Sequence, residues 1–320
     1  MTIVSVKNIV KTFPVKKGVF SLSKKRIHAV NDISFEINAG ETLAIVGESG
    51  CGKSTTGRLI TRLMIPDSGE IWYNGQNISA LDNKQMLPLR KQIQIIFQDP
   101  YSSLNPRMTA ESIIAEPLLM QGKMRTSARR KAVHELMEIV GLPAEYGTRY
   151  PHEFSGGQRQ RIGIARALVS SPRLVVADEP ISALDVSIRA QILNLMQRLQ
   201  KDFSLTYLFI SHDLSIVEVI SDRVAVMYLG SIVELGPKES LYKNPKHPYT
   251  KALLQAVPVP NPKLRKEKEI LQGEIPSNID MPGGCPFQTR CTKVKPDCTR
   301  GKIEPRDLGG SHTVACLYID

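Results

Sequence analysis

Hydrophobic residues follow two different periods along the first two thirds of the chain, and these periods predict strands and helices in turn. Near the N-terminus, residues 3–6 and 34–37 alternate between apolar and polar side chains, as half-buried antiparallel strands do. Three later segments, at 42–46, 174–177 and 205–210, are continuous apolar runs, which are typical of strands buried on both faces of a parallel sheet.

Between these strands, apolar side chains repeat at the three- and four-residue spacing of helices. Residues 110–140 carry such a repeat, one helix is expected to begin near Lys53, and another should open within residues 154–161 and run through Leu168. A further stripe follows the second buried strand and consists of Ile188, Ile192, Leu195 and Leu199. Alternating buried strands and helices predict an α/β fold with a parallel sheet. In such sheets, ligands bind at the carboxyl ends of the strands.

The character of the chain changes after about residue 237. Prolines interrupt this part of the chain repeatedly, and four of the five cysteines lie in it. We therefore expect a separate, loop-rich module at the C-terminus, and we place its first residue at 257.

Composition describes an ordinary soluble protein with enough apolar material for a core, at 42% hydrophobic and 23% charged residues. No stretch approaches ~18 consecutive apolar residues, and the N-terminus lacks the features of a signal peptide, so the chain is expected to stay in the cytoplasm. The net charge of +11 suggests an anionic neighbour, which could be nucleic acid, an acidic protein face or the inner membrane leaflet, or it reflects only a solvated surface. Basic residues are scattered, without the aromatic interleaving of a nucleic-acid site, so no nucleic acid is expected as a partner.

Residues 47–54, with the sequence GESGCGKS, follow a buried strand and precede a predicted helix. This is the context of a phosphate-binding loop, in which glycines let backbone N–H groups converge on phosphates at a helix N-terminus. We expect Lys53 to neutralise the β- and γ-phosphates and the Ser54 hydroxyl to ligate Mg²⁺. The residues predicted to bind the nucleotide here are Gly47, Glu48, Ser49, Gly50, Cys51, Gly52, Lys53, Ser54 and Thr55.

Two carboxylates lie at the end of the second buried strand. Asp178 ends that strand, where a carboxylate is costly without a cation, and Mg²⁺ is the natural partner. Glu179 stands beside it and is better placed to accept a proton from an attacking water. The alternative interpretation is a carboxylate pair that simply faces solvent.

A second glycine-rich segment, Ser155-Gly156-Gly157-Gln158, places a hydroxyl and two glycines at the start of a predicted helix. This segment, called the serine–glycine cradle below, is a candidate anion site with Arg159 and Arg161 just behind it. An ordinary helix cap is the alternative interpretation.

Five elements follow one another along the chain: residues 47–54, Gln98, residues 154–161, residues 174–180 and His212. In this order they closely resemble the motifs of the ATP-binding-cassette (ABC) ATPases. The resemblance implies a mixed-sheet core, an antiparallel β subdomain and a helical subdomain, all within residues 1–256, followed by the cysteine-containing module at 257–320. It implies that Gln98 ligates Mg²⁺ and links the site to a transport partner, and that His212 contacts the γ-phosphate. It also implies that residues 182–185, including Asp185, communicate across a dimer.

In that dimer, Ser155 and Gly157 touch the ATP that is held by the opposite subunit's phosphate loop, so the resemblance implies that both subunits complete one reaction centre. Phe13 resembles the aromatic residue that stacks on adenine. Phe20 is its rival, because a basic insertion follows Phe13.

Four further segments resemble the peptide-importer branch of this family, at residues 97–109, 247–258, 273–277 and 284–291. They imply import of dipeptides or oligopeptides at the cytoplasmic face of the cell membrane. The implied partners are a second related ATPase subunit, two permeases and an external binding protein. Importers of nickel chelates and glutathione share these signatures and remain open as alternatives.

Two interpretations from other classes are weaker. A soluble ATPase that acts on nucleic acid or the ribosome usually carries two cassettes or a long coiled coil, and this chain has one cassette and no sustained heptads. A regulatory module that senses ATP without turnover is disfavoured by the presence of Glu179 and His212.

The four C-terminal cysteines are separated by five, six and seventeen residues, and disulfides between them are not expected in a reducing cytoplasm. Their spacing fits neither zinc ribbons nor the bacterial ferredoxin run, so it does not choose between Zn²⁺, an iron–sulfur cluster and empty reduced thiols. The family resemblance favours a [4Fe–4S] cluster with a structural or sensing role. Its ligands would be Cys285, Cys291, Cys298 and Cys316.

Overall fold

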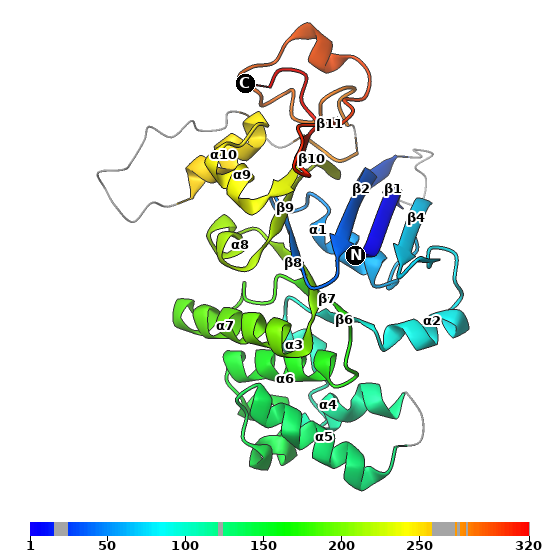
Figure 1. Ribbon diagram of the computed structural model, residues 1–320, viewed down its shortest axis with the longest axis vertical. Coiled ribbons are helices and arrows are strands. Elements are labelled where there is room, and N and C mark those ends of the chain that lie inside the picture. The colour runs from blue at the N-terminus through cyan, green and yellow to red at the C-terminus, as the bar shows by residue number, and fades with distance from the viewer. Residues whose placement is uncertain (16–24, 121–123, 258–272, 274–275, 280, 320) are drawn as a thin grey trace. The chain divides into compact units, whose positions relative to one another are not determined.

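The computed structural model describes residues 1–15, 25–120, 124–257, 273, 276–279 and 281–319 (Figure 1). The chain groups into two compact units. The first comprises Met1–Asn38, Thr42–Ala80 and Ser211–Asp320, and the second comprises Ala39–Glu41 and Leu81–Ile210. None of the described helices combines the length and the apolar character that crossing a bilayer requires.

An antiparallel sheet in the first unit confirms the two N-terminal strands. Its strands are β1 (Thr2–Pro14), β2 (Arg26–Asn38), β4 (Ser68–Tyr73) and β5 (Gln76–Asn77), in the order β2-β1-β4-β5. Both β1 and β2 extend well beyond the alternating segments. The register shifts between Val6 and Ile9, and Asn8 adopts a φ of 50°, so the two-residue period is interrupted although the strand continues.

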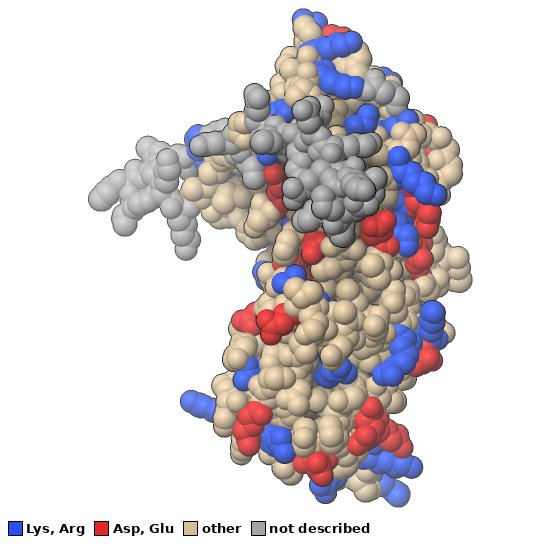
Figure 2. Space-filling model, turned by 90° about the vertical axis from the view of Figure 1, so that its left-hand side faces the viewer, with Lys and Arg blue, Asp and Glu red and all other residues tan. Residues whose placement is uncertain are grey.

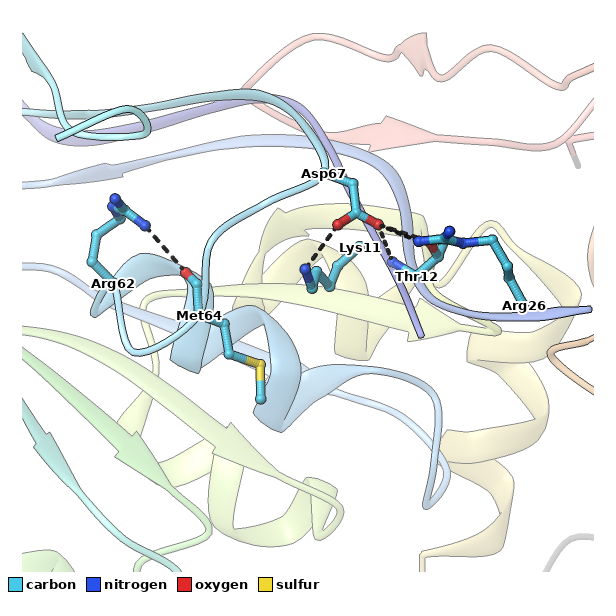
Figure 3. A network of polar contacts seen from close by, with 6 residues as sticks. All are labelled: Lys11, Thr12, Arg26, Arg62, Met64 and Asp67. Atoms are coloured by element: carbon cyan, nitrogen blue, oxygen red, sulfur yellow. Dashed lines mark hydrogen bonds and ion pairs between the residues drawn. The ribbon is translucent and has the colours of Figure 1, made fainter. Parts of the chain in front are cut away.

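Asp67, just before β4, ties together the far ends of β1 and β2 (Figure 3). Its carboxylate accepts hydrogen bonds from Lys11 Nζ at 2.8 Å and from the Thr12 backbone and hydroxyl at 2.8 and 2.7 Å, and it lies 3.5 Å from the Arg26 guanidinium. Burial alone would raise the pKa of Asp67, but these donors lower it to about 2. The network fixes the end of β1, which carries Phe13.

The first unit also contains a mixed sheet. Strand β3 (Thr42–Val46), which is buried throughout, pairs in parallel with β9 (Arg223–Tyr228). Strands β10 (Ser231–Pro237), β12 (Thr313–Val314) and β11 (Arg306–Asp307) then follow in antiparallel pairs, so part of the C-terminal region adds strands to this sheet. The helices of this unit are α1 (Lys53–Ile60), α8 (Leu214–Ile220), α9 (Lys238–Lys243), α10 (Pro248–Ala256) and the 3₁₀ turn η4 (Pro296–Thr299).

In the second unit, three strands pair in parallel in the order β6 (Ile93–Ile96), β7 (Leu174–Asp178) and β8 (Thr206–Ser211). Every residue of β7 and β8 is buried, as the continuous apolar runs predicted. Helix α7 (Val186–Phe203) buries Ile192, Leu195 and Leu199 of the predicted stripe.

The remaining helices of the second unit include the predicted helical subdomain, and residues 110–140, which carry the helical repeat, form two helices. These helices are α2 (Asn83–Arg90), α3 (Pro100–Ser103), α4 (Ala110–Leu119), α5 (Thr126–Ile139), α6 (Gly156–Leu168) and the 3₁₀ turns η1 (Ala144–Thr148) and η2 (Pro151–Glu153). The predicted mixed-sheet, antiparallel-β and helical parts are therefore all present. The boundary at residue 257 stays a prediction.

Charge on the described surface is mixed. On the face drawn in Figure 2, lysine and arginine residues are interspersed with aspartate and glutamate residues, and uncharged areas separate them. The positive net charge therefore does not gather into one continuous basic patch on that face.

Candidate nucleotide site

The phosphate loop, Gly47–Ser54, connects the buried strand β3 to α1, as the sequence predicted. At two of its glycines, a backbone carbonyl group of another strand lies too close to leave room for a side chain. A Cβ on Gly47 would lie 2.1 Å from the Met227 carbonyl oxygen, and one on Gly52, whose φ is 106°, would lie 2.0 Å from the Ala29 carbonyl oxygen. Since both neighbours are backbone atoms of paired strands, only glycine fits at these two positions.

Lys53 opens α1 and is 4% exposed. Its ammonium donates to the carbonyl oxygens of Gly47 at 2.8 Å and Glu48 at 2.9 Å. The lysine is thus bent back over its own loop, where the helix N-terminus and the ammonium group place positive charge together. Ser54 and Thr55 follow in the first turn of α1 and are half-buried. These residues fit a phosphate-bearing ligand.

A pocket of about 380 Å³ lies beside the loop and is lined by Glu48, Ser49, Gly50 and Cys51 together with Ile27. Ile27 is the register partner of Phe13 across the β1–β2 pair. Partners in antiparallel strands project on the same face, so half-buried Phe13 lies on the face that reaches this pocket. The rival aromatic, Phe20, lies outside the described residues.

Within the second unit, Gln98 and Glu179 meet although 81 residues separate them. Gln98 follows β6 and Glu179 follows β7, and the Gln98 side-chain amide donates to Glu179 Oε2 at 3.0 Å. The Glu179 backbone adopts the left-handed region, with φ at 47°, while its N–H donates to the Ile210 carbonyl at 3.0 Å. Such a strained conformation in a non-glycine residue is common at functional sites. Asp178 is the last residue of β7 and is 3% exposed.

The serine–glycine cradle forms the N-terminus of α6. The Ser155 hydroxyl accepts the Gln158 N–H at 3.3 Å, and the Gln158 side chain accepts the Ser155 N–H at 2.9 Å. This is a capping box, so the segment does cap α6, as the alternative interpretation expected. Capping by these groups does not exclude that the same helix N-terminus binds an anion. Gly157 is buried and packs against Ile188, whose Cγ2 would lie 2.6 Å from an added Cβ.

The two arginines behind the cradle are engaged elsewhere in the second unit. Arg159 donates to the Pro151 carbonyl at 2.6 Å and stacks its guanidinium over Tyr101 at 3.7 Å. Arg161 donates to the Val140 carbonyl. Both side chains hold backbone of the helical subdomain in place.

Two further predicted residues lie at helix entrances. Asp185 is the exposed N-cap of α7 and makes no side-chain capping bond. His212 is exposed and lies between β8 and α8.

The four C-terminal cysteines, which the family resemblance implies as cluster ligands, lie near one another. Cys285, Cys291, Cys298 and Cys316 all line one cavity, called the cysteine cavity below, and all four are free thiols. Burial raises the pKa of Cys285 to about 11. Over the described part of the chain, no three histidine, cysteine, aspartate or glutamate side chains are arranged to hold a metal ion. The four thiols therefore share a space, but their arrangement over the described residues does not form a metal site.

Three residues that contact the phosphate loop were not identified from the sequence. The Arg290 guanidinium forms two bonds with the Glu48 carboxylate, at 2.8 and 3.2 Å, the Tyr249 hydroxyl accepts the Glu48 N–H at 3.0 Å, and the Asn278 amide donates to the Gly50 carbonyl at 3.1 Å. Each lies more than 200 residues from its partner. The available signal was that all three fall in or directly after segments that resemble the peptide-importer branch.

A phosphate loop between a buried strand and a helix, in a chain with parallel strands that end in carboxylates, defines a P-loop nucleotide-binding protein. Residues 30–182 match the ABC transporter family, and residues 233–298 match the oligopeptide/dipeptide transporter C-terminal region.

Two relatives match nearly the whole chain. The oligopeptide transport ATP-binding protein AppF of Bacillus subtilis (strain 168) is 52% identical over 321 residues, covering 99% of this chain and 98% of that protein. The dipeptide transport ATP-binding protein DppF of Escherichia coli (strain K12) is 50% identical over 310 residues, covering 97% and 92%. A solved dimeric, post-hydrolysis structure of the ATP-binding cassette MJ0796, bound to ADP and Pi, has a TM-score of 0.66 at 30% identity and covers 73% of this chain and 98% of that one. The chain therefore belongs to the ABC transporter ATPases, in the branch that carries the oligopeptide/dipeptide transporter C-terminal region.

Proposed function

We propose that this chain hydrolyses ATP to drive import of dipeptides or oligopeptides through a membrane ABC transporter. The observation that carries the proposal is the 52% identity to an oligopeptide transport ATP-binding protein over 99% of the chain. The match of residues 233–298 to the oligopeptide/dipeptide transporter C-terminal region supports the same substrate class.

In the proposed reaction, Phe13 stacks on adenine, Lys53 and the backbone N–H groups of residues 47–55 hold the phosphates, and His212 contacts the γ-phosphate. We assign Mg²⁺ ligation to Ser54, Asp178 and Gln98, and bound Mg²⁺ supplies charge neutralisation at the transferring phosphoryl group. Glu179 acts as the general base toward water. The hydrogen bond between Gln98 and Glu179 supports a role for Gln98 in orienting that base.

The proposed active form pairs this chain with a second, related ATPase subunit. In it, the serine–glycine cradle and Asp185 act on the nucleotide held by the neighbouring subunit, and the similarity to a dimeric cassette structure supports this arrangement. The domains are 1–256 for nucleotide binding and 257–320 for the C-terminal module. Two permeases hold the subunits at the cytoplasmic face of the membrane, and an external protein delivers the substrate.

Ser155→Asp tests the role of the cradle across the dimer. Aspartate also caps helices well, so α6 is expected to form and the variant to bind nucleotide through its own loop. The added negative charge would face the phosphates of the neighbouring site and repel them. We expect ATP hydrolysis by the assembled transporter to fall by roughly tenfold or more. Ser155→Thr is the matched control and should retain most of the activity, whereas full activity of Ser155→Asp would contradict the proposal.

We also propose that the four cysteines hold a [4Fe–4S] cluster. The support is the donor set, because four free thiols, the ligands that such clusters use, line one cavity. Bound there, a cluster would cross-link loops of the C-terminal module. Zn²⁺ is the alternative.

Anaerobic purification should yield about four iron and four sulfide per chain, as the cluster formula requires. Cys298→Ser is expected to lose most of the iron, while Cys51→Ser, which removes the cysteine of the phosphate loop, should retain it. Measurement of iron, sulfide and zinc decides the outcome. Stoichiometric zinc without sulfide would contradict the cluster.

The substrate is tested by transport into vesicles that contain the complete importer and ATP. Uptake of dipeptides or oligopeptides supports the proposal, whereas uptake of only glutathione or a nickel chelate would correct the substrate and leave the ATPase role standing. Hydrolysis that responds to nucleic acid rather than to permeases would contradict transport itself.

A further inference from the structure

We infer that Arg290 is a positioning residue for the phosphate loop, which it holds through Glu48 from the side of the C-terminal region. The inference rests on the proposed role of residues 47–55 in binding nucleotide. Arg290 is not a catalytic residue, because it acts through Glu48.

The ion pair between Arg290 and Glu48 has the geometry of a fixed support. Two guanidinium nitrogens reach the two carboxylate oxygens at 2.8 and 3.2 Å. Such two-point contacts restrain orientation as well as distance. The Arg290 side chain is 7% exposed and that of Glu48 is 25% exposed, so loss of Glu48 would leave the Arg290 charge poorly solvated.

Every polar group of Glu48 has a partner around the loop. Its carboxylate binds Arg290, its N–H donates to the Tyr249 hydroxyl at 3.0 Å, and its carbonyl accepts from Lys53 at 2.9 Å. The peptide planes on both sides of Glu48 are therefore restrained. One of these contacts belongs to the lysine that is proposed to bind phosphate.

A second attachment lies two residues further along the loop. The Asn278 side-chain amide donates to the Gly50 carbonyl at 3.1 Å, while the Asn278 carbonyl accepts the N–H of His28 on β2. The C-terminal region thus binds the loop on both sides of Ser49. A loop held in its binding conformation before the ligand arrives loses less conformational freedom on binding.

Aromatic rings support the side chains that hold Glu48. The ring centroids of Tyr228, Tyr249 and Phe287 lie 4.6 to 5.3 Å apart, and Arg290 lies 5.9 Å from the Tyr228 ring. All three rings are almost completely buried. Because close-packed side chains have little room to move, Tyr249 and Arg290 are held in one arrangement.

The test measures equilibrium binding of a fluorescent ATP analogue to the purified full-length chain. Arg290→Gln is expected to raise the Kd about tenfold, which corresponds to releasing the backbone of roughly one loop residue. At saturating ATP, hydrolysis by the assembled transporter should fall by less than about threefold, since the catalytic groups are unchanged. Arg290→Lys keeps the positive charge but carries it on a single nitrogen, which cannot make the two-point contact of the guanidinium. Its Kd should therefore lie between those of Arg290→Gln and the wild type.

A matched control and a double variant separate positioning from charge and packing. Arg300→Gln removes the same charge from an exposed position of the C-terminal region and should leave the Kd unchanged. Glu48→Gln should raise the Kd as Arg290→Gln does. The Kd of the double variant should not exceed the higher of the two single-variant values, because both substitutions remove the same ion pair. Additive losses would overturn the inference.

The outcomes also distinguish the inference from the function on which it rests. If wild type binds the analogue, Lys53→Ala does not, and folded Arg290→Gln binds as tightly as wild type, the positioning role is wrong and the nucleotide site stands. If Lys53→Ala binds as tightly as wild type, the proposed site itself is wrong. Should Arg290→Gln fail to fold by thermal melting, Arg290→Lys decides, and an unchanged Kd in that variant overturns the inference.

Discussion

Glu179→Gln is expected to leave nucleotide binding intact and to reduce ATP hydrolysis by about 10²–10⁴-fold, the usual contribution of a general base. Glutamine has the same shape but cannot accept a proton from water. Its side-chain oxygen can still accept the hydrogen bond that Gln98 donates at 3.0 Å. Because glutamine is the same size as glutamate, the left-handed backbone conformation at residue 179 should not change. The loss should therefore be chemical rather than structural.

Steady-state hydrolysis by the assembled transporter and binding of a fluorescent ATP analogue measure the two halves of this prediction. Because ATP stays bound but unhydrolysed, the variant is also expected to keep the ATPase dimer closed. Glu145→Gln, an exposed carboxylate change in the same unit, is the control and should hydrolyse ATP normally. Unchanged hydrolysis by Glu179→Gln would remove Glu179 from the role of base.

The second large effect is expected for Gly52→Ala. The added Cβ would lie 2.0 Å from the Ala29 carbonyl oxygen on β2 and 2.9 Å from the end of the Met227 side chain, at a φ of 106° that alanine rarely adopts. The methionine could move, but the backbone carbonyl could not without disturbing β2. We expect nucleotide binding to be lost, and the free energy of unfolding to fall by about 3 kcal/mol or more from strain and overlap together.

Gly50→Ala is the matched control within the same loop. Its φ is 78°, but no heavy atom lies within 4 Å of the added Cβ, so only conformational strain of roughly 1–2 kcal/mol is expected. Thermal unfolding and nucleotide affinity should therefore rank wild type first, Gly50→Ala second and Gly52→Ala last. Equal behaviour of the two alanine variants would show that the approach to Ala29 does not constrain the loop.

Strands and helices could be predicted from the sequence wherever burial of one or both faces produces a regular pattern of apolar residues. The runs that became β3, β7 and β8 are buried throughout, and the helical stripe of α7 faces inward, because apolar spacing follows directly from which face is removed from water. The lengths of β1 and β2 were underestimated. A register shift beside Asn8 interrupts the alternation on which the prediction relied.

The chemical groups of the site could also be named from the sequence, because phosphate loops and strand-end carboxylates are short, local patterns. Their contacts could not be predicted. Only the adjacency of β6 and β7 brings Gln98 to Glu179, and the sequence gives no spacing from which that hydrogen bond could be inferred.

By itself, the sequence determined the α/β class, the phosphate loop, the carboxylates beside the second buried strand and the presence of four cysteines in one region. The tertiary structure decided which distant groups restrain that loop. Arg290 reaches Glu48 across 242 residues, and Asn278 reaches Gly50 across 228. The physical reason is that local patterns record burial and backbone conformation, whereas a contact between remote side chains depends on how the chain between them folds.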